Sequence, residues 1–260
     1  MRPLLLPPGC ATSEHLEKVR ARFGGTLHAP VSLPPGLRLA FLCFTNRCGS
    51  NYLASLLATS GKLNAASEML NAEEVCRVAD QFGINSFQQY FAAIAQHDMR
   101  SGVFLTKLAV PHLPLLVESG LLQHCRATAV FLLMERDDKL AQAISHAIAS
   151  ETESWTSAMP ARRAPETLTF SRAAVAARLD AIVEDNRRFD AFFAYNGFIP
   201  TRIVYERLLA APRPELDLIA QRLGLPALEV DPARVPIAPQ AGHVNTDWRR
   251  LFLEEEERKR

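Results

Sequence analysis

The clearest pattern along the chain is a short apolar run that changes abruptly into helical spacing. Every residue from Leu39 to Phe44 is hydrophobic, which predicts a strand buried on both faces of an α/β sheet. After it, Leu53, Leu56 and Leu57 repeat at helical spacing, with Ser50 as the expected N-cap. The intervening turn should therefore point backbone N–H groups, at the positive end of a helix dipole, toward a bound anion.

Further segments continue this alternation of strands and helices. Strands are predicted over Gly102–Val110, over Ala127–Glu135 and over "TRIVYE" at residues 201–206. Helices are predicted over Ser171–Tyr195 and Pro214–Leu223. One face of the longer helix comprises Leu179, Ile182, Val183, Asn186, Phe189, Phe192 and Phe193. The order predicts one α/β domain, with a central parallel sheet flanked by helices and right-handed crossovers between its strands.

The first 38 residues differ in character from the rest of the chain. A helix is predicted over Ser13–Phe23, and the proline-punctuated segment "APVSLPPG" at residues 29–36 follows it. We therefore expect an N-terminal arm at residues 1–38 and a body at residues 39–260.

Within the body, two irregular stretches are candidates for functional loops. Gly61 should stop the first helix, and an irregular loop then leads to a helix that starts near Asn71. The stretch from Ser154 to Phe170 is polar, contains proline and lacks periodicity, as in a surface loop or an active-site lid. The tail "EEEERKR" at residues 254–260 is interpreted as a solvated helix end.

Composition narrows the class of protein. The 260 residues are 48% hydrophobic and 22% charged, as expected for a soluble globular domain with a large core. A net charge of +1 gives no general attraction to nucleic acid or anionic lipid, so anion recognition must be local and the partner small. The five scattered cysteines argue against a full disulfide framework or a zinc site and favour a reducing cytoplasm. The opening "MRPLLLPPGC" is too short and too proline-broken for a signal peptide, and no apolar run approaches transmembrane length.

The anion-binding turn lacks the two commonest phosphate-binding signatures. A Walker A loop needs Gly-x-x-x-x-Gly-Lys followed by Ser or Thr, whereas this turn has a single glycine, and GxGxxG is absent as well. The order Arg47, Cys48, Gly49, Ser50 and Asn51 resembles instead the 5'-phosphosulfate-binding loop of sulfotransferases. In that loop a basic residue precedes Ser-Gly-Thr/Ser-Thr at the start of the first helix. Cys48 here replaces the usual serine and Asn51 the usual threonine, and both keep their backbone N–H groups.

A second match lies far away in the sequence. Sulfotransferases carry an arginine at the end of a central strand and a serine in the following helix, which together hold the 3'-phosphate of the sulfate donor. Arg136 and Ser145 occur in that arrangement, within Arg-x-Asp-Lys-x-x-Gln-Ala-x-Ser, and Thr152 and Trp155 follow. This detail is similar to the bacterial trehalose sulfotransferase family and its lipopolysaccharide sulfotransferase relatives. The segments "FFAYNGFIPTRIVYERLLAAP" and "HVNTDWRRLF" extend the resemblance toward the C-terminus.

This resemblance implies a P-loop-like sulfotransferase fold and a specific chemistry. The donor would be 3'-phosphoadenosine 5'-phosphosulfate (PAPS), and the product adenosine 3',5'-bisphosphate (PAP). Arg47 and the amides of residues 49–51 would stabilise charge on the leaving phosphate in a loose in-line transition state. Glu68 stands where the family carries its catalytic glutamate and would take the proton of the acceptor hydroxyl. No metal is expected, since a sulfonate carries less negative charge than a phosphoryl group.

Each of these residues also has a structural interpretation. Arg47 or Arg136 would serve equally well as a surface charge, and Ser145 as a helical serine bonded back to the preceding turn. Trp155 would be a loop anchor on the core. Cys48 at a helix N-terminus has the position of a reactive thiolate, but no histidine base accompanies it in the sequence nearby.

Two other functions stay open from the sequence. A P-loop-type kinase with a degenerate loop would use Glu135, at the end of a predicted strand, as its Walker B-type acid. A non-enzymatic binding module would keep the nucleotide fold without the chemistry. If Glu68 is not the base, His112 and His146 are the remaining candidates near strand ends. The family resemblance favours a carbohydrate or glycolipid acceptor and a homodimer like that of its relatives. We expect the Ser154–Phe170 loop and the segment around Glu68 to form the wall of the acceptor site.

Overall fold

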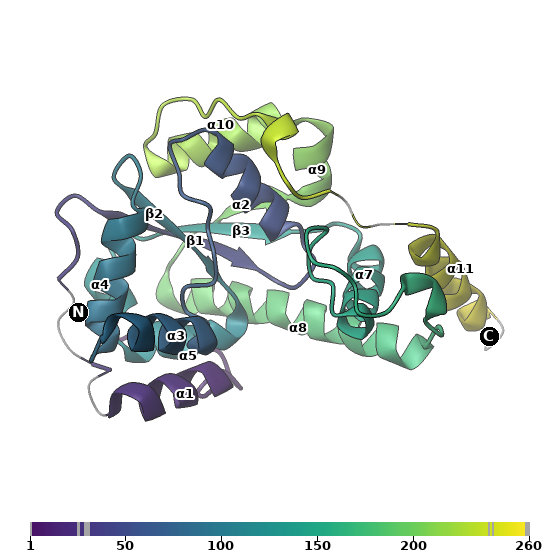
Figure 1. The fold of residues 1–260 in the computed structure, drawn as a ribbon, viewed down its shortest axis with the longest axis horizontal. Coiled ribbons are helices and arrows are strands. Elements are labelled where there is room, and N and C mark those ends of the chain that lie inside the picture. The colour runs from purple at the N-terminus through teal and green to yellow at the C-terminus, as the bar shows by residue number, and fades with distance from the viewer. Residues whose placement is uncertain (1, 25–26, 29–31, 239, 241, 258–260) are drawn as a thin grey trace.

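The centre of the protein is a four-stranded parallel sheet (Figure 1). The computed structural model describes residues 2–24, 27–28, 32–238, 240 and 242–257. The strands lie in the order β2-β1-β3-β4. Their bounds are β1 Arg38–Phe44, β2 Val103–Leu108, β3 Val130–Glu135 and β4 Thr201–Val204. The predicted α/β fold with a central parallel sheet is confirmed.

The helices cover both faces of this sheet (Figure 1). In the first half of the chain they are α1 Glu14–Phe23, α2 Ser50–Thr59, α3 Ala72–Phe82, α4 Phe87–Asp98, α5 Leu113–Glu118 and α6 Leu121–Cys125. In the second half they are α7 Lys139–Thr152, α8 Arg172–Asn196, α9 Tyr205–Ala210, α10 Pro212–Leu223 and α11 His243–Glu257. Short 3-10 turns add η2 Val110–His112, η3 Pro165–Thr167 and η4 Pro232–Arg234.

Alternation along the strands divides the core into two apolar clusters. Phe41 of β1 and Phe131 of β3 stack at 5.3 Å in the cluster that includes residues of α1, α3, α4, α5 and α8. Leu42 and Leu132, one position further along each strand, belong to the other cluster, with residues of α2 and α10. Both sheet faces are therefore buried, which explains why the strands read as continuous hydrophobic runs.

The predicted strands and helices are present, but several of them begin or end at other residues than predicted. The strands predicted over Gly102–Val110 and Ala127–Glu135 are shorter than expected. The segment "TRIVYE" is a strand only as far as Val204, because residues 205 and 206 begin α9. The last predicted helix begins earlier, at Pro212, whose ring suits the first helical turn. A helix starts near Asn71 as predicted, and the Asn71 side chain caps α3 by accepting the amide of Glu73. Val183 of α8 was placed on the apolar face but is 52% exposed.

The N-terminal helix is packed into the core. Leu16, Val19 and Phe23 of α1 are buried in the same cluster as β1, and α1 contacts α3 and α5. The predicted helix over Ser13–Phe23 is present, and Ser13 is its N-cap, which accepts the amide of Leu16. The division into an arm at residues 1–38 and a body at residues 39–260 stays a prediction. Residues 29–31 of the expected linker and 258–260 of the tail lie outside the described residues.

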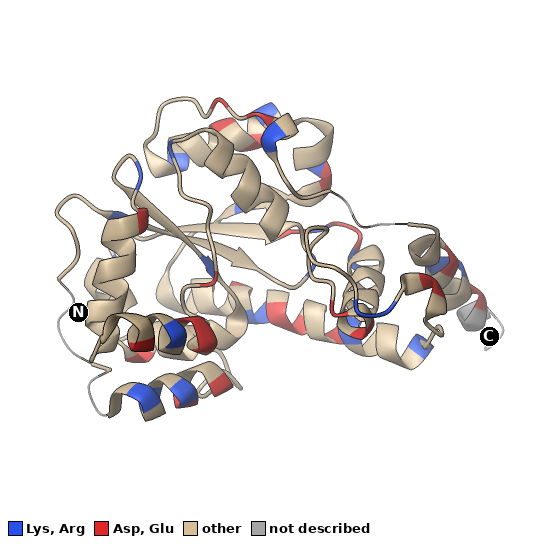
Figure 2. Ribbon diagram, in the orientation of Figure 1, with Lys and Arg blue, Asp and Glu red and all other residues tan. Residues whose placement is uncertain are grey.

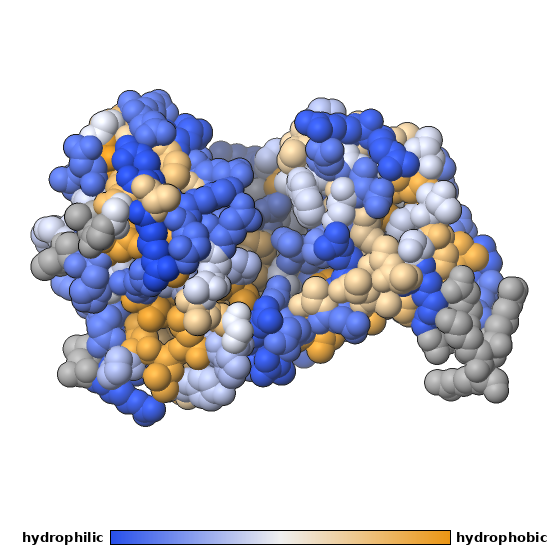
Figure 3. Space-filling model, turned by 90° about the horizontal axis from the view of Figure 1, so that it is seen from below, coloured by the Kyte–Doolittle hydropathy of each residue, from blue (hydrophilic) through white to orange (hydrophobic). Residues whose placement is uncertain are grey.

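Charged residues of both signs are spread over the outer helices, and few lie on the sheet (Figure 2). Seen from below, the surface is hollowed between the half that carries α1 and α3 and the half that carries α11 (Figure 3). Within the described ranges, no helix has the length and apolar character needed to cross a membrane.

Candidate active site

A cavity of about 990 Å³ lies where the strands β1, β2 and β3 end. Ligands of open α/β sheets bind at this carboxyl edge. Of the residues singled out in the sequence, the cavity wall contains Arg47, Gly49, Ser50, Asn51, Glu68, Arg136 and Ser145, together with Trp155. Cys48 is the exception, because its side chain is buried in the apolar cluster beneath the turn. The fold thus gathers seven of the eight candidate residues around one space.

The turn before α2 has a backbone shape that only glycine allows at one position. Gly49 is the N-cap of α2 with a φ of 98°, and Arg47 also lies in the left-handed region, at 65°. A Cβ on residue 49 would overlap the ring of Tyr205, at the start of α9. Ser50, the expected N-cap, is instead the first residue of the helix, since the left-handed cap excludes a side chain. The backbone of the turn therefore stays open for close approach of a ligand.

Helix α7 holds this turn in place from the other side. The side-chain nitrogen of Gln142, Nε2, donates to Thr45 Oγ1 and to the carbonyl oxygen of Asn46, both at 2.8 Å. Gln142 is fully buried. Asp138 caps α7 by accepting the amide of Ala141 at 2.9 Å. Asp138 and Gln142, two residues of the Arg-x-Asp-Lys-x-x-Gln-Ala-x-Ser pattern, thus stabilise the helix and the turn. The sequence alone did not indicate these roles.

The Arg47 guanidinium has contacts on three sides. Its Nε donates to Ser145 Oγ at 3.0 Å, and its Nη2 donates to Gln240 Oε1 at 2.7 Å. Its Nη1 donates to the carbonyl oxygen of Trp155. Burial and the nearby Arg136 guanidinium lower the pKa of Arg47. The residue predicted for the 5'-phosphosulfate and the serine predicted for the 3'-phosphate are therefore direct neighbours.

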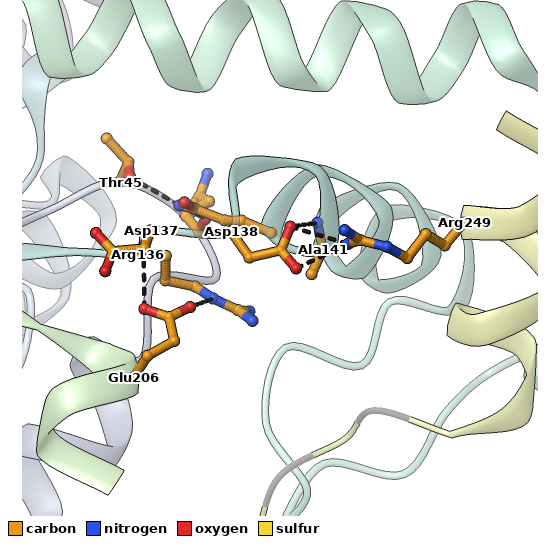
Figure 4. Close-up of polar contacts among 9 residues, drawn as sticks. Thr45, Arg136, Asp137, Asp138, Ala141, Glu206 and Arg249 are labelled. Carbon is orange, nitrogen blue, oxygen red and sulfur yellow. Dashed lines mark hydrogen bonds and ion pairs between the residues drawn. The ribbon is translucent and has the colours of Figure 1, made fainter. Parts of the chain in front are cut away.

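Arg136 follows the end of β3 and faces the start of α9 (Figure 4). Its Nε lies 3.3 Å from Glu206 Oε1, and its guanidinium lies 4.9 Å from the centre of the Tyr205 ring. The other oxygen of Glu206 accepts the amide of Asp137 at 3.0 Å. This carboxylate and ring orient Arg136 while leaving it in the cavity wall.

Asp138 and Arg249 form the opposite rim of this region (Figure 4). Arg249 of α11 donates to Asp138 Oδ2 at 2.7 Å. Burial raises the pKa of Asp138, but the bonds from the Ala141 amide and from Arg249 outweigh it, so that this pKa lies below its usual range. The pair joins α11 to the start of α7.

The loop that carries Glu68 is fixed along β2. Asn64 exchanges two hydrogen bonds with the backbone of Leu105, at 2.8 and 3.0 Å. The carbonyl oxygen of Ser67 accepts the amide of Lys107 at 2.9 Å. Glu68 itself is 37% exposed and lies 3.0 Å from the ammonium of Lys107. The carboxylate of Glu68 thus lines the cavity from a loop that is fixed by hydrogen bonds to β2.

The alternative candidates lie outside the cavity. Neither His112 nor His146 is part of its wall, and burial lowers their pKa values to about 3 and about 4. Glu135, the acid required by the kinase hypothesis, is paired with Arg202 at 2.8 Å and does not line the cavity. Burial raises the pKa of the Cys48 thiol, which opposes its use as a nucleophile.

His112 should make the stability of the protein depend on pH. Its Nδ1 accepts the amide of Ala109 at 3.1 Å, and burial, with His15 and Lys107 nearby, keeps the ring neutral down to a pKa of about 3. The unfolded chain would take up this proton near pH 6.5, so stability should fall as the pH drops from about 6.5 toward 3. Denaturant unfolding should give a free energy of unfolding that is lower at pH 5 than at pH 7 by a loss on the order of 1–2 kcal/mol. His112→Gln should reduce it, whereas His97→Gln, on an exposed side chain, should not; an equal pH slope in all three proteins would contradict this role.

Sequence reasoning missed several residues of the cavity. Lys107 was counted only as part of a predicted strand, although a single lysine inside an apolar run is itself a signal. The strand predicted over residues 201–206 includes Tyr205 and Glu206, and a strand at this position gives no reason to expect that these side chains approach the anion-binding turn. Gln240 lies in an irregular segment, and nothing in its sequence surroundings indicates the contact with Arg47. Among the described residues, no three His, Cys, Asp or Glu side chains are grouped as a metal site would require.

Comparison with protein families identifies the class of protein that this fold and cavity form. A sulphotransferase family model matches residues 40–255, which is most of the chain and includes every element of the sheet except the first residues of β1. The protein is a sulfotransferase. More narrowly, the matching model is that of the Stf0 sulphotransferases, and the chain belongs to this family. No curated protein sequence matches the chain.

Proposed function

We propose that the protein transfers a sulfuryl group from PAPS to a hydroxyl of a carbohydrate or glycolipid. The observation that carries this proposal is the cavity in which Arg47, Arg136 and the start of α2 lie together with the carboxylate of Glu68. Cations and a helix N-terminus suit a donor with phosphates at both ends. The cavity volume is also in the range of small-molecule sites.

In this proposal the chain supplies position, charge and one base. Arg136 and Ser145 hold the 3'-phosphate, and Arg47 with the amides of residues 49–51 holds the 5'-phosphosulfate. Glu68 takes the proton of the acceptor hydroxyl as the acceptor oxygen bonds to sulfur. The bond between sulfur and the bridging phosphate oxygen breaks, and its electron pair stays on the leaving phosphate, beside Arg47.

The test is direct transfer of label from [35S]PAPS to a panel of carbohydrate and glycolipid acceptors. A parallel thermal-shift assay compares PAP with Mg-ATP. We expect labelled product from at least one acceptor, and a rise in melting temperature with PAP but not with Mg-ATP. A protein stabilised by Mg-ATP alone would support the kinase alternative instead. Stabilisation by PAP without transfer to any acceptor or to water would support a binding module.

The 3'-phosphate assignment gives a separate prediction. Arg136→Ala removes a charge-assisted contact worth about 1.5 to 3 kcal/mol, so affinity for PAP should fall roughly ten- to a hundredfold. Arg202→Ala, which removes a half-exposed arginine outside the cavity, is the matched control and should bind PAP as the wild type does. Calorimetry measures both constants. An unchanged dissociation constant in folded Arg136→Ala protein would remove Arg136 from the donor site.

We also place the protein in the cytoplasm and as a homodimer. The five cysteines are all free, and four of them are buried, which suits a reducing compartment. Light scattering on the purified protein tests the dimer.

A further inference from the structure

Helix α1 lies against α3 and is bonded to it near both ends (Figure 1). At the start of α3, His15 Nδ1 accepts the amide of Ala72 at 3.1 Å. Toward its other end, the guanidinium of Arg22 donates to Asp80 Oδ1 at 2.9 Å and to the carbonyl oxygen of Ile84 at 3.2 Å. The position of α3 is therefore set by α1 at its first turn as well as at its last.

Helix α1 is itself anchored in the protein. Three of its apolar side chains are buried in the core cluster that includes residues of β1. Its Arg20 donates to both carboxylate oxygens of Glu118 on α5. The helix lies outside residues 40–255, which the family model matches. An element beyond the matched region thus supports a helix that begins beside the cavity.

The contact at Ala72 needs a neutral histidine. A ring nitrogen accepts a hydrogen bond only while it carries no proton. The ring of His112 lies 4.6 Å from that of His15, with the ring planes inclined at 62°. Burial lowers the pKa of His15 below its usual value. His15 Nδ1 is therefore available as an acceptor at neutral pH.

The loop that carries Glu68 is held next to this residue without help from α1. The carbonyl oxygen of Ser67 accepts the amide of Lys107 at 2.9 Å and the hydroxyl of Thr106 at 3.0 Å, both from β2. Because these two bonds adjoin Glu68, the proposed base should stay in place when the contact with α1 is lost.

The stretch of this loop beyond the proposed base depends on α4 and on α1. The Tyr90 hydroxyl of α4 donates to the carbonyl oxygen of Met69 at 2.8 Å. The next bond to another element is the one between the Ala72 amide and His15. Asn71 lies between these two bonds and lines the cavity. Loss of the bond to His15 would therefore loosen this part of the cavity wall.

We propose that His15 is a positioning residue for the acceptor, which acts through the amide of Ala72 to fix the cavity wall at Asn71. This role rests on the proposed function. It gives the N-terminal helix a part in acceptor recognition, although the helix does not line the cavity itself. It also predicts a defect in acceptor binding rather than in donor binding or in proton removal.

His15→Leu tests the proposal, since it removes the accepting nitrogen and keeps an apolar side chain against His112. With [35S]PAPS and the best acceptor of the panel, we expect KM for the acceptor to rise about threefold to tenfold, as the loss of one hydrogen bond implies. Turnover at saturating acceptor should stay within about threefold of wild type, and PAP affinity within about twofold. His97→Leu, on an exposed histidine, is the matched control and should leave KM unchanged.

Two further variants separate the hydrogen bond from packing. His15→Asn places an amide oxygen where Nδ1 now lies, so it should restore most of the acceptor KM. His15→Gln places its amide group where Nε2 now lies, so it should resemble His15→Leu. This pair of polar variants keeps the comparison possible if His15→Leu does not fold.

Several results would overturn the role of His15. One is an acceptor KM within about twofold of wild type in folded His15→Leu or His15→Gln protein. Another is a loss of PAP affinity as large as the rise in KM, which would show general damage to the site. A third is a His15→Asn protein as defective as His15→Gln, which would exclude the hydrogen bond as the cause. If wild-type protein neither binds PAP nor transfers label, the proposed function itself fails.

Discussion

Glu68→Gln should lower turnover by roughly a hundred- to ten-thousandfold while leaving PAP affinity near wild type. The substitution keeps the size of the side chain and an oxygen that accepts from Lys107, but it removes the ability to take a proton. Loss of a positioned general base costs about this much. Steady-state rates with [35S]PAPS and the best acceptor give the first quantity, and calorimetry with PAP gives the second.

The chain offers close controls for this experiment. Glu73 and Glu74 lie in the first turn of α3, just beyond the Glu68 loop, and Glu74 is already engaged by Arg77 at 2.6 Å. Glu74→Gln should be nearly silent. Glu73→Gln should be nearly silent too, although Glu73 also lines the cavity, because its side chain is 83% exposed to solvent. If Glu68→Gln turned over normally with its true acceptor, another residue would have to be the base, although burial and position both disfavour His112 and His146.

Arg47→Ala should lower turnover by about a hundredfold to a thousandfold, and donor affinity by much less. Its charge is needed most when the leaving phosphate becomes more negative, so its loss should appear mainly in the chemical step. Arg47→Lys should recover part of the rate, because many sulfotransferases resemble this loop with a lysine at that position. Single-turnover rates with bound PAPS measure the chemical step separately from binding.

The contacts of Arg47 call for one more control. Its guanidinium also ties Trp155 and Gln240 to the turn, so Arg47→Ala releases two segments as well as removing a charge. Gln240→Ala breaks one of these ties and leaves the charge in place, and it should retain most of the turnover. An Arg47→Ala enzyme that loses donor affinity alone, with turnover intact, would show that the arginine binds the donor without acting in the transition state.

The sequence predicts the parts of this fold that local pattern controls. The run from Leu39 to Phe44 is a buried strand as predicted, and a helix starts beside Asn71 as predicted. The candidate residues 47–51, 136 and 145 could be named because their order along the chain resembles known sulfotransferase motifs at a loop and at a strand end. Their roles stay predictions, but all except Cys48 have side chains or backbone in the cavity wall.

The missed features depend on contacts between distant segments. The ammonium of Lys107 is hydrogen-bonded to Asn51 and Glu68, which are 56 and 39 residues away in the chain. Tyr205 belongs to the site because α9 folds over the turn at Gly49. Periodicity and propensity describe a segment against its own neighbours, and they hold no information about such pairings.

The contact between Gly49 and Tyr205 limits how this enzyme could be re-engineered. Phosphate loops are attractive modules for transplantation between nucleotide-binding proteins, since they are short and continuous in sequence. Here the shape of the loop is set in part by a ring that enters from α9, more than a hundred and fifty residues later in the chain. A grafted loop that places any side chain where Gly49 now lies would collide with that ring. Exchange of donor specificity in this scaffold would therefore require the loop and the start of α9 to be redesigned together.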